Sequence, residues 1–132
     1  MTSDFIVVAN RLPVDRVQSG DQVEWKPSPG GLVTALKPVL QSREGAWVGW
    51  PGCIDEVNVS EMPSVKEAGV RMLPVNLDAG DHELFYEGFS NATLWPLYHD
   101  LIVSPNFNKA FWERYREVNQ RFAEAVADEA AE

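Results

Sequence analysis

The sequence predicts an α/β fold, in which the short strands of a parallel sheet alternate with helices. Residues 5–9 form a continuous, largely β-branched apolar run, which is typical of a strand buried on both faces of a parallel sheet. Residues 45–50 and 70–75 have the composition of two further short strands. Near the end of the chain the apolar residues recur with a helical period, so strands and helices alternate as they do in α/β domains.

Polar and turn-forming residues follow the first strand. Asn10 and Arg11 come directly after it, and Pro13 is expected to stop its hydrogen-bond ladder. Residues 14–26 alternate loosely between apolar and polar side chains around a Ser-Gly-Asp turn, which predicts a small exposed hairpin.

Two helical segments are expected between the predicted strands. The proline- and glycine-rich turn at residues 27–31 leads into a helix over residues 32–37, which Pro38 should limit or kink. The acidic connection after the second strand is loose, and residues 64–68 are expected to form one helical turn within it.

An aromatic segment dominates the second half of the chain. Residues 78–81 are suited to cap a helix over residues 82–86. Residues 85–99 then combine flat aromatic faces with polar tips, without the clean period of a core helix or strand. This pattern suits a pocket wall that grips a polar, ring-shaped ligand, and it equally suits an irregular aromatic mini-core around a broken helix.

The last predicted element is an amphipathic helix of about five turns. Its apolar face consists of Phe111, Tyr115, Val118, Phe122 and Ala125. Pro105 and Asn106 precede it as start signals, and no glycine cap follows it, so we expect the sequence to be cut within this helix.

Composition excludes several classes of partner. The formal charge of -9 and the scattered 11 Lys and Arg residues argue against nucleic acid or an anionic membrane as partner, because both need clustered basic side chains. The single cysteine, Cys53, excludes an internal disulfide. With no apparent signal peptide and no membrane-length apolar run, we expect a cytoplasmic protein.

Two features at the expected ligand edge of the sheet suit an anion. Ligands of open α/β sheets bind outside the carboxyl ends of the strands, where Arg11 offers a fork of donors for a phosphate or carboxylate. The alternative for Arg11 is a surface ion pair with Asp15 or another acid. Gly30 and Gly31 precede a helix and suit a close approach of backbone N–H groups to an anion, although a plain turn would use the same residues.

The aromatic candidates suit a sugar. Trp47 and Trp50 lie three residues apart, so in a strand they face opposite sides, and one of them is available to stack on a ligand. Tyr86 and Trp95 supply the flat faces and hydrogen-bonding edges that a sugar ring uses. The two histidines lack a neighbouring ligand cluster, so we expect no zinc site.

Four motifs in a fixed order carry a family resemblance. They are Ala-Asn-Arg-Leu-Pro at residues 9–13, Ser-Pro-Gly-Gly-Leu-Val-Thr-Ala-Leu at 28–36, Trp-Val-Gly-Trp-Pro-Gly at 47–52, and Phe-Ser-Asn-Ala-Thr-Leu-Trp-Pro-Leu-Tyr-His at 89–99. Together they resemble the N-terminal part of the trehalose-6-phosphate synthases, a family of retaining GT-B glycosyltransferases. The spacing of aromatic and apolar residues from 112 to 123 is similar to that family too.

The resemblance implies a fold, a reaction and a set of site residues. The fold is the Rossmann-like N-terminal domain of a GT-B glycosyltransferase, here incomplete. The reaction is transfer of glucose from a nucleotide-glucose donor (UDP-, GDP- or ADP-glucose) to glucose 6-phosphate, giving trehalose 6-phosphate without a metal or other cofactor. The implied acceptor-site residues are Arg11 for the phosphate, Tyr86, Trp95 and Trp50, with Trp47 as the alternative to Trp50, and the donor's diphosphate is approached by Gly30 and Gly31.

The resemblance also sets an expectation for the domain organisation. We expect residues 1–132 to form a truncated acceptor-side domain, without the C-terminal nucleotide-sugar domain and its Arg and Lys. The chain alone should therefore be inactive, because leaving-group stabilisation needs those cations. The alternatives are a non-catalytic module that binds a sugar phosphate and a related synthase with another acceptor, such as glycerol 3-phosphate. The sequence leaves open whether the protein forms a homo-oligomer.

Overall fold

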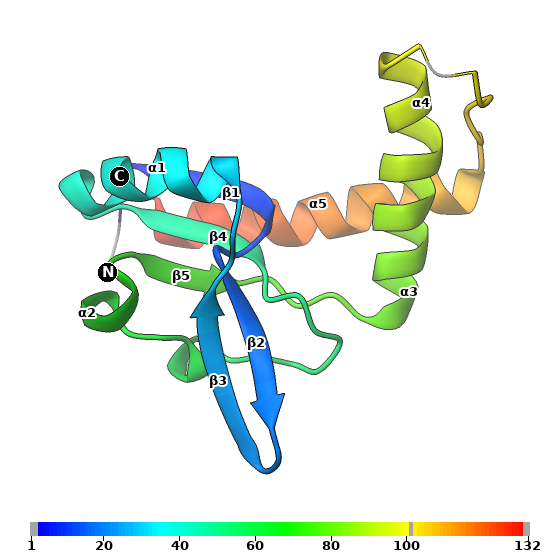
Figure 1. The fold of residues 1–132 in the computed structure, drawn as a ribbon. Helices are drawn as coiled ribbons and strands as arrows, with labels where there is room; N and C mark the ends of the chain where they lie inside the picture. The colour runs from blue at the N-terminus through cyan, green and yellow to red at the C-terminus, as the bar shows by residue number, and fades with distance from the viewer. Residues whose placement is uncertain (1–2, 101, 131–132) are drawn as a thin grey trace. The chain divides into compact units, whose positions relative to one another are not determined.

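The computed structural model describes residues 3–100 and 102–130, which divide into two compact units (Figure 1). The first, called the sheet unit here, comprises the described residues up to Asn76 together with those from Phe122 onward. The second, called the helical unit, comprises the described residues of Leu77–Arg121. The two units are described separately below.

A three-stranded parallel sheet organises the sheet unit. Its order is β1-β4-β5, and its strands are β1 (Ile6–Arg11), β4 (Ala46–Trp50) and β5 (Arg71–Pro74). Strand β1 pairs with β4 from Ile6 opposite Ala46, and a register shift after Val8 brings Arg11 opposite Trp50. All three strands therefore end at one edge of the sheet, which is the ligand edge of open α/β folds.

The expected burial of the first strand on both faces is wrong. Strand β4 is buried at every position, whereas Val8 in β1 is 50% exposed. The reason is position in the sheet: among the described residues β1 pairs on one side only, while β4 lies between two strands. Strand β1 is also longer than expected, since it includes Asn10 and Arg11 rather than ending before them.

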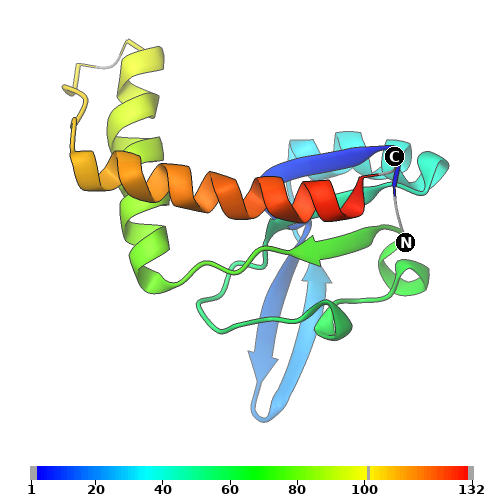
Figure 2. The ribbon, with the colours of Figure 1, turned by 180° about the vertical axis from the view of Figure 1, so that it is seen from behind.

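Helices cover both faces of this sheet. Helix α1 (Gly31–Arg43) lies on one face, and the turns of α5 (Lys109–Glu129) that belong to the sheet unit lie on the other, as the opposite views of Figures 1 and 2 show. One cluster of buried core residues in the unit consists of Leu12, Val14, Leu40, Trp47, Val57, Met62, Val70 and Met72. At the amino end of β1, the hydroxyl of Ser3 donates to the buried carboxylate of Glu129 near the end of α5 at 2.6 Å.

The expected limit of the first helix at Pro38 is wrong, because α1 continues to Arg43. An interior proline costs a helix about 3 kcal/mol through its missing N–H and its ring clash. Packing offsets that cost here: Leu40 is buried in the core, and Val33 and Leu36 pack against it. The helix is therefore held by apolar contacts on both sides of the proline.

The remaining connections of the sheet unit follow the sequence closely. The predicted hairpin is confirmed as β2 (Val14–Ser19) and β3 (Gln22–Pro27), which pair antiparallel. The predicted single turn is α2 (Val65–Ala68), and the short helix η1 (Val59–Glu61) precedes it. In α2 the hydroxyl of Ser64 accepts from the Glu67 amide while the Glu67 carboxylate accepts from the Ser64 amide, which completes a capping box.

The helical unit explains why the aromatic segment lacks a clean period. Its elements are α3 (Ala79–Asp81), the π-helix η2 (His82–Leu94), α4 (Trp95–Tyr98) and the first part of α5. Asp78 caps α3 as expected, and the chain then continues as helix well past residue 86. In η2 the amide of Trp95 bonds to the carbonyl of Ser90, five residues back, so its faces do not repeat with the α-helical period.

Aromatic side chains hold η2 and α5 together within the helical unit. The rings of Phe85 and Phe89 on η2 lie 5.8 Å and 4.5 Å from the ring of Tyr115, centroid to centroid. Gly88 lets the helices approach, since a Cβ there would lie 2.8 Å from the ring of Phe111. The aromatic contacts of the mini-core alternative are thus present, although the helix around them is continuous.

The predicted C-terminal helix is confirmed, but it begins later than its start signals suggested. The side chain of Asn108 accepts a hydrogen bond from the amide of Ala110 at 2.9 Å, as a helix cap does. Asn106 instead bonds through its amide to the carbonyl of Ala92 at 2.8 Å. None of the helices in the described ranges has the length and apolar composition to cross a membrane.

A buried carboxylate ties the start of η2 to α5. Asp81 is fully buried, and Arg121 donates to both its oxygens at 2.7 Å while Arg114 donates to one of them at 2.8 Å. Burial by itself raises the pKa of Asp81. The hydrogen bonds from Arg121 and Arg114 lower the pKa by more than burial raises it, so the net pKa lies well below the ordinary range. Asp81 is therefore charged in the folded protein at neutral pH.

Replacing this carboxylate should destabilise the helical unit. Asp81→Asn leaves two guanidinium groups without their anion, and breaking a buried ion pair in this way costs about 3–5 kcal/mol. Asp128→Asn, which replaces an exposed carboxylate on α5, is the control and should change the free energy of unfolding by less than about 0.5 kcal/mol. Urea unfolding of both variants at pH 7 tests this, and equal midpoints would contradict it.

The same carboxylate should make stability depend on acid pH. Because the folded pKa of Asp81 is lowered, its stabilisation is fully present above the unfolded pKa of about 3.9 and is lost as the pH falls toward the folded pKa. The difference in unfolding free energy between the wild type and Asp81→Asn should therefore narrow below about pH 4. Urea unfolding at pH 7 and pH 3 measures it; a difference that grows toward pH 3 would have the wrong sign.

Candidate functional site

The carboxyl ends of β1 and β4 bring Arg11 and Trp50 together. The two residues are register partners, and the amide of Leu12 donates to the carbonyl of Trp50 at 2.9 Å. The Cζ atom of Arg11 lies 5.5 Å from the centre of the Trp50 ring, within the range of a cation–π contact. The sheet thus holds a guanidinium beside an indole face at its ligand edge.

The expected ion pair of Arg11 with Asp15 is present. The Nη2 atom of Arg11 lies 2.7 Å from the Asp15 carboxylate, and the two side chains are 44% and 41% exposed. A pair this exposed contributes at most about 1 kcal/mol. The pair therefore does not exclude the anion-binding hypothesis, because a doubly charged phosphate is able to compete with one exposed carboxylate for the guanidinium.

Both tryptophans are buried, Trp50 being 7% exposed, but their contacts differ. Trp47 is only 1% exposed and packs in the core, where its indole N–H donates to the carbonyl of Arg11 at 3.0 Å. Trp50 lies under the guanidinium, and its indole N–H donates to the carbonyl of Cys53 at 3.0 Å. Trp47 fixes the backbone of Arg11, while Trp50 contacts its charged group.

Gly30 and Gly31 form the amino end of α1 in the same unit. The carbonyl of Gly30 accepts from the amide and the hydroxyl of Thr34 at 3.0 Å and 2.9 Å, and no side chain caps the helix there. A Cβ at Gly31 would meet nothing within 4 Å. The site is open, and its helical N–H groups and dipole suit a negatively charged ligand.

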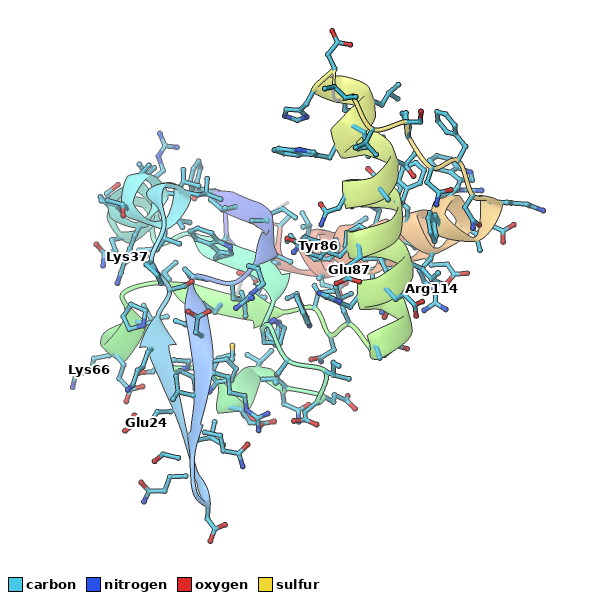
Figure 3. The ribbon with its side chains drawn as sticks, turned by 45° about the vertical axis from the view of Figure 1, so that its right-hand side comes forward. Glu24, Lys37, Lys66, Tyr86, Glu87 and Arg114 are labelled. Carbon is cyan, nitrogen blue, oxygen red and sulfur yellow. The ribbon has the colours of Figure 1, made fainter. Side chains whose placement is uncertain are left out.

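Tyr86 and Trp95 belong to the helical unit, where η2 and α4 carry them. In an α-helix, residues nine positions apart face opposite sides, because each residue turns about 100°. The wider π-turns of η2 rotate less per residue, so this α-helical rule does not hold for Tyr86 and Trp95. Figure 3 labels the side chain of Tyr86 on η2 and that of Arg114 on α5.

Each of these two aromatics has a histidine neighbour. The rings of His82 and Tyr86 lie 5.3 Å apart, and the rings of Trp95 and His99 are stacked at 3.7 Å. His99 also meets the carbonyl of Trp95 through Nδ1 at 2.9 Å, and Trp95 remains 54% exposed. Each histidine therefore lies against an aromatic ring. These contacts are not predicted from the sequence, where the histidines are considered only as metal ligands.

Gly52 is the residue of this edge that the sequence interpretation overlooked. In the sequence, Pro51 and Gly52 stand out only as the end of the Trp-Val-Gly-Trp-Pro-Gly motif, and nothing in that local pattern indicates a contact between Gly52 and Arg11, 41 positions away. In the folded chain Gly52 has a φ of 85° and faces the guanidinium. Only the pairing of β1 with β4 reveals this neighbour.

With the geometry described, comparison with known proteins decides the family. The sequence profile of glycosyltransferase family 20 matches residues 3–132. The chain belongs to glycosyltransferase family 20. Its mixed α/β fold with a parallel sheet is the one seen in solved members of the family.

Named relatives of this family 20 chain are trehalose-6-phosphate synthases. The protein of that name from Mycolicibacterium gilvum is 58% identical over 98% of this chain and 26% of its own length. The α,α-trehalose-phosphate synthase (UDP-forming) of Burkholderia vietnamiensis superimposes with a TM-score of 0.71 at 30% identity, over 96% of this chain and 25% of its own. The Burkholderia xenovorans enzyme, solved with glucose-6-phosphate, gives 0.68 at 27% identity, over 95% and 25%. The chain thus spans about a quarter of the length of these relatives.

Trp47 and Trp95 of this family 20 chain should differ in their contribution to the free energy of unfolding. Trp47→Ala should cost about 3–5 kcal/mol of unfolding free energy, because it empties a core position. Trp95→Ala should cost less than about 1 kcal/mol, because its side chain is half exposed. Urea unfolding of the two variants checks this, and a larger loss for Trp95→Ala would contradict it.

Proposed function

We propose that the protein carrying this chain is a trehalose-6-phosphate synthase that transfers glucose from UDP-glucose to glucose 6-phosphate. The family and the 58% identity to a protein of that name support the reaction. The UDP-forming name of a similar solved enzyme supports uracil as the donor's base, which the sequence left open. The chemistry is retaining glycosyl transfer: the bond from the glucosyl C1 to UDP breaks, a bond from C1 to the acceptor's hydroxyl oxygen forms, and the proton of that hydroxyl is released together with UDP.

The observation that carries this proposal is the half-exposed guanidinium of Arg11 at the ligand edge of the sheet. Its fork of donors matches a phosphate group, and its present partner Asp15 is held only by an exposed ion pair. We assign Arg11 to the phosphate of glucose 6-phosphate. The solved relative with bound glucose-6-phosphate supports this acceptor.

The sugar ring of the acceptor needs flat faces with hydrogen-bonding edges. We assign Trp50, Tyr86 and Trp95 to it, because aromatic side chains stack on sugar C–H faces and their polar tips reach hydroxyl groups. Trp50 comes from the sheet unit, and Tyr86 and Trp95 come from the helical unit.

The donor's diphosphate is assigned to Gly30 and Gly31. The uncapped N–H groups at the amino end of α1 supply hydrogen bonds, and the absence of side chains allows the phosphates to approach. Stabilising the departing UDP needs cations aimed at its phosphates. We place those cations in a part of the complete protein outside this chain, so the 132-residue chain should be inactive alone.

Arg11→Ala in the complete protein tests the acceptor assignment. Loss of charged hydrogen bonds worth about 1.5–3 kcal/mol should raise the KM for glucose 6-phosphate roughly 10- to 100-fold and leave the KM for UDP-glucose nearly unchanged. Arg16→Ala is the matched control, because Arg16 is a nearby arginine that pairs with Asp55 at 2.8 Å. Steady-state kinetics with each substrate varied in turn gives both values.

The outcomes separate the proposal from its alternatives. Equal effects of Arg11→Ala on both substrates would overturn the phosphate assignment. Faster transfer to glycerol 3-phosphate than to glucose 6-phosphate by the wild type would identify a related synthase with another acceptor. Binding of glucose 6-phosphate without any transfer would identify a non-catalytic sugar-phosphate module.

A further inference from the structure

The guanidinium of Arg11 lies against Gly52, at the place where the Cβ of any other residue would be. A Cβ built on Gly52 would lie 2.5 Å from Cζ and 2.9 Å from Nε of Arg11. These distances are closer than real Cβ contacts, so any other residue at position 52 would displace the guanidinium. The φ of 85° at Gly52 turns the Cβ position toward Arg11.

Two other glycines with positive φ show that this contact is not a general feature of turns. Gly20 in the hairpin turn has a φ of 62°, and a Cβ there would meet nothing within 4 Å. At Gly69, with a φ of 75°, the Cβ would meet the end of the Gln41 side chain. Only at Gly52, among these three, is the neighbour a charged group at the ligand edge.

The guanidinium is bounded by other groups as well as by Gly52. The Asp15 carboxylate lies 2.7 Å from Nη2 of Arg11, and the guanidinium lies over the ring of Trp50. The arginine side chain is flexible, so moving it for a side chain at position 52 would cost little stability beyond the backbone strain that a φ of 85° imposes on any residue other than glycine. The effect of that substitution should therefore appear in ligand binding more than in unfolding.

We propose that Gly52 is a positioning residue for Arg11: by lacking a side chain, it leaves the space in which the guanidinium is set for an anionic ligand. This inference rests on the proposed function, in which that anion is the phosphate of glucose 6-phosphate. Gly52 itself touches no reacting atom and acts through Arg11. It thus adds a steric determinant of acceptor affinity to the charge of the arginine.

The test compares Gly52→Ala with Gly20→Ala in the complete protein. Both substitutions place a Cβ at a positive φ and carry a similar backbone strain, but only the first meets a guanidinium. Gly52→Ala should raise the KM for glucose 6-phosphate roughly 10- to 100-fold, as displacement of a binding group by about 1 Å does, and leave the KM for UDP-glucose unchanged. Gly20→Ala should change neither value.

A double variant distinguishes positioning from a general structural effect. If Gly52 acts only through Arg11, then Arg11→Ala with Gly52→Ala should have the same KM for glucose 6-phosphate as Arg11→Ala alone. Multiplied effects of the two substitutions would overturn the inference, and so would a Gly52→Ala variant with wild-type kinetics. An unchanged KM in Arg11→Ala alone would instead overturn the proposed function, so the two failures are distinguishable.

Folding itself supplies a second readout. If Gly52→Ala fails to fold while Gly20→Ala folds, adding Arg11→Ala should restore folding, because the new Cβ then has no guanidinium to displace. Thermal unfolding followed by circular dichroism measures this. Failure of the double variant to fold would show that Gly52 serves the turn rather than Arg11.

Discussion

The parallel pairing of β1 with β4 is the interaction on which the candidate site depends. Its register shift after Val8 sets Arg11 opposite Trp50 at the carboxyl edge of the sheet. Two hydrogen bonds then fix the chain there, from the Leu12 amide to the Trp50 carbonyl and from the Trp47 indole to the Arg11 carbonyl. Since β4 is buried throughout, this pairing also holds the arginine backbone, at the end of β1, against a fully buried strand.

A fixed backbone and a weakly held charged group form a useful combination. The backbone of Arg11 is anchored by the core tryptophan, whereas its guanidinium is held by an exposed carboxylate, an aromatic face and the open side of Gly52. A ligand phosphate that replaces Asp15 meets a guanidinium already set in place, so little conformational freedom is lost on binding. The contrast with Asp81 is informative, because that carboxylate is buried between two arginines and serves the fold.

Sequence reasoning predicted the elements whose signals are local. The hairpin, the short strands, the single helical turn over residues 64–68 and the amphipathic α5 all follow from period and turn chemistry. It was wrong about Pro38, because core packing of Leu40 outweighs the local cost, and about β1, because edge position is a property of the whole sheet. The π-helix was missed since its period is neither 3.6 nor 2, and the Gly52 contact was missed since it joins residues distant in sequence.

The most direct test of the central claim is a crystal structure of the complete protein with glucose 6-phosphate bound. The account predicts that the phosphate lies within hydrogen-bond distance of the Arg11 guanidinium, with Asp15 released from it and the guanidinium still against Gly52. A sugar phosphate bound elsewhere, with the pair of Arg11 and Asp15 intact, would contradict the account.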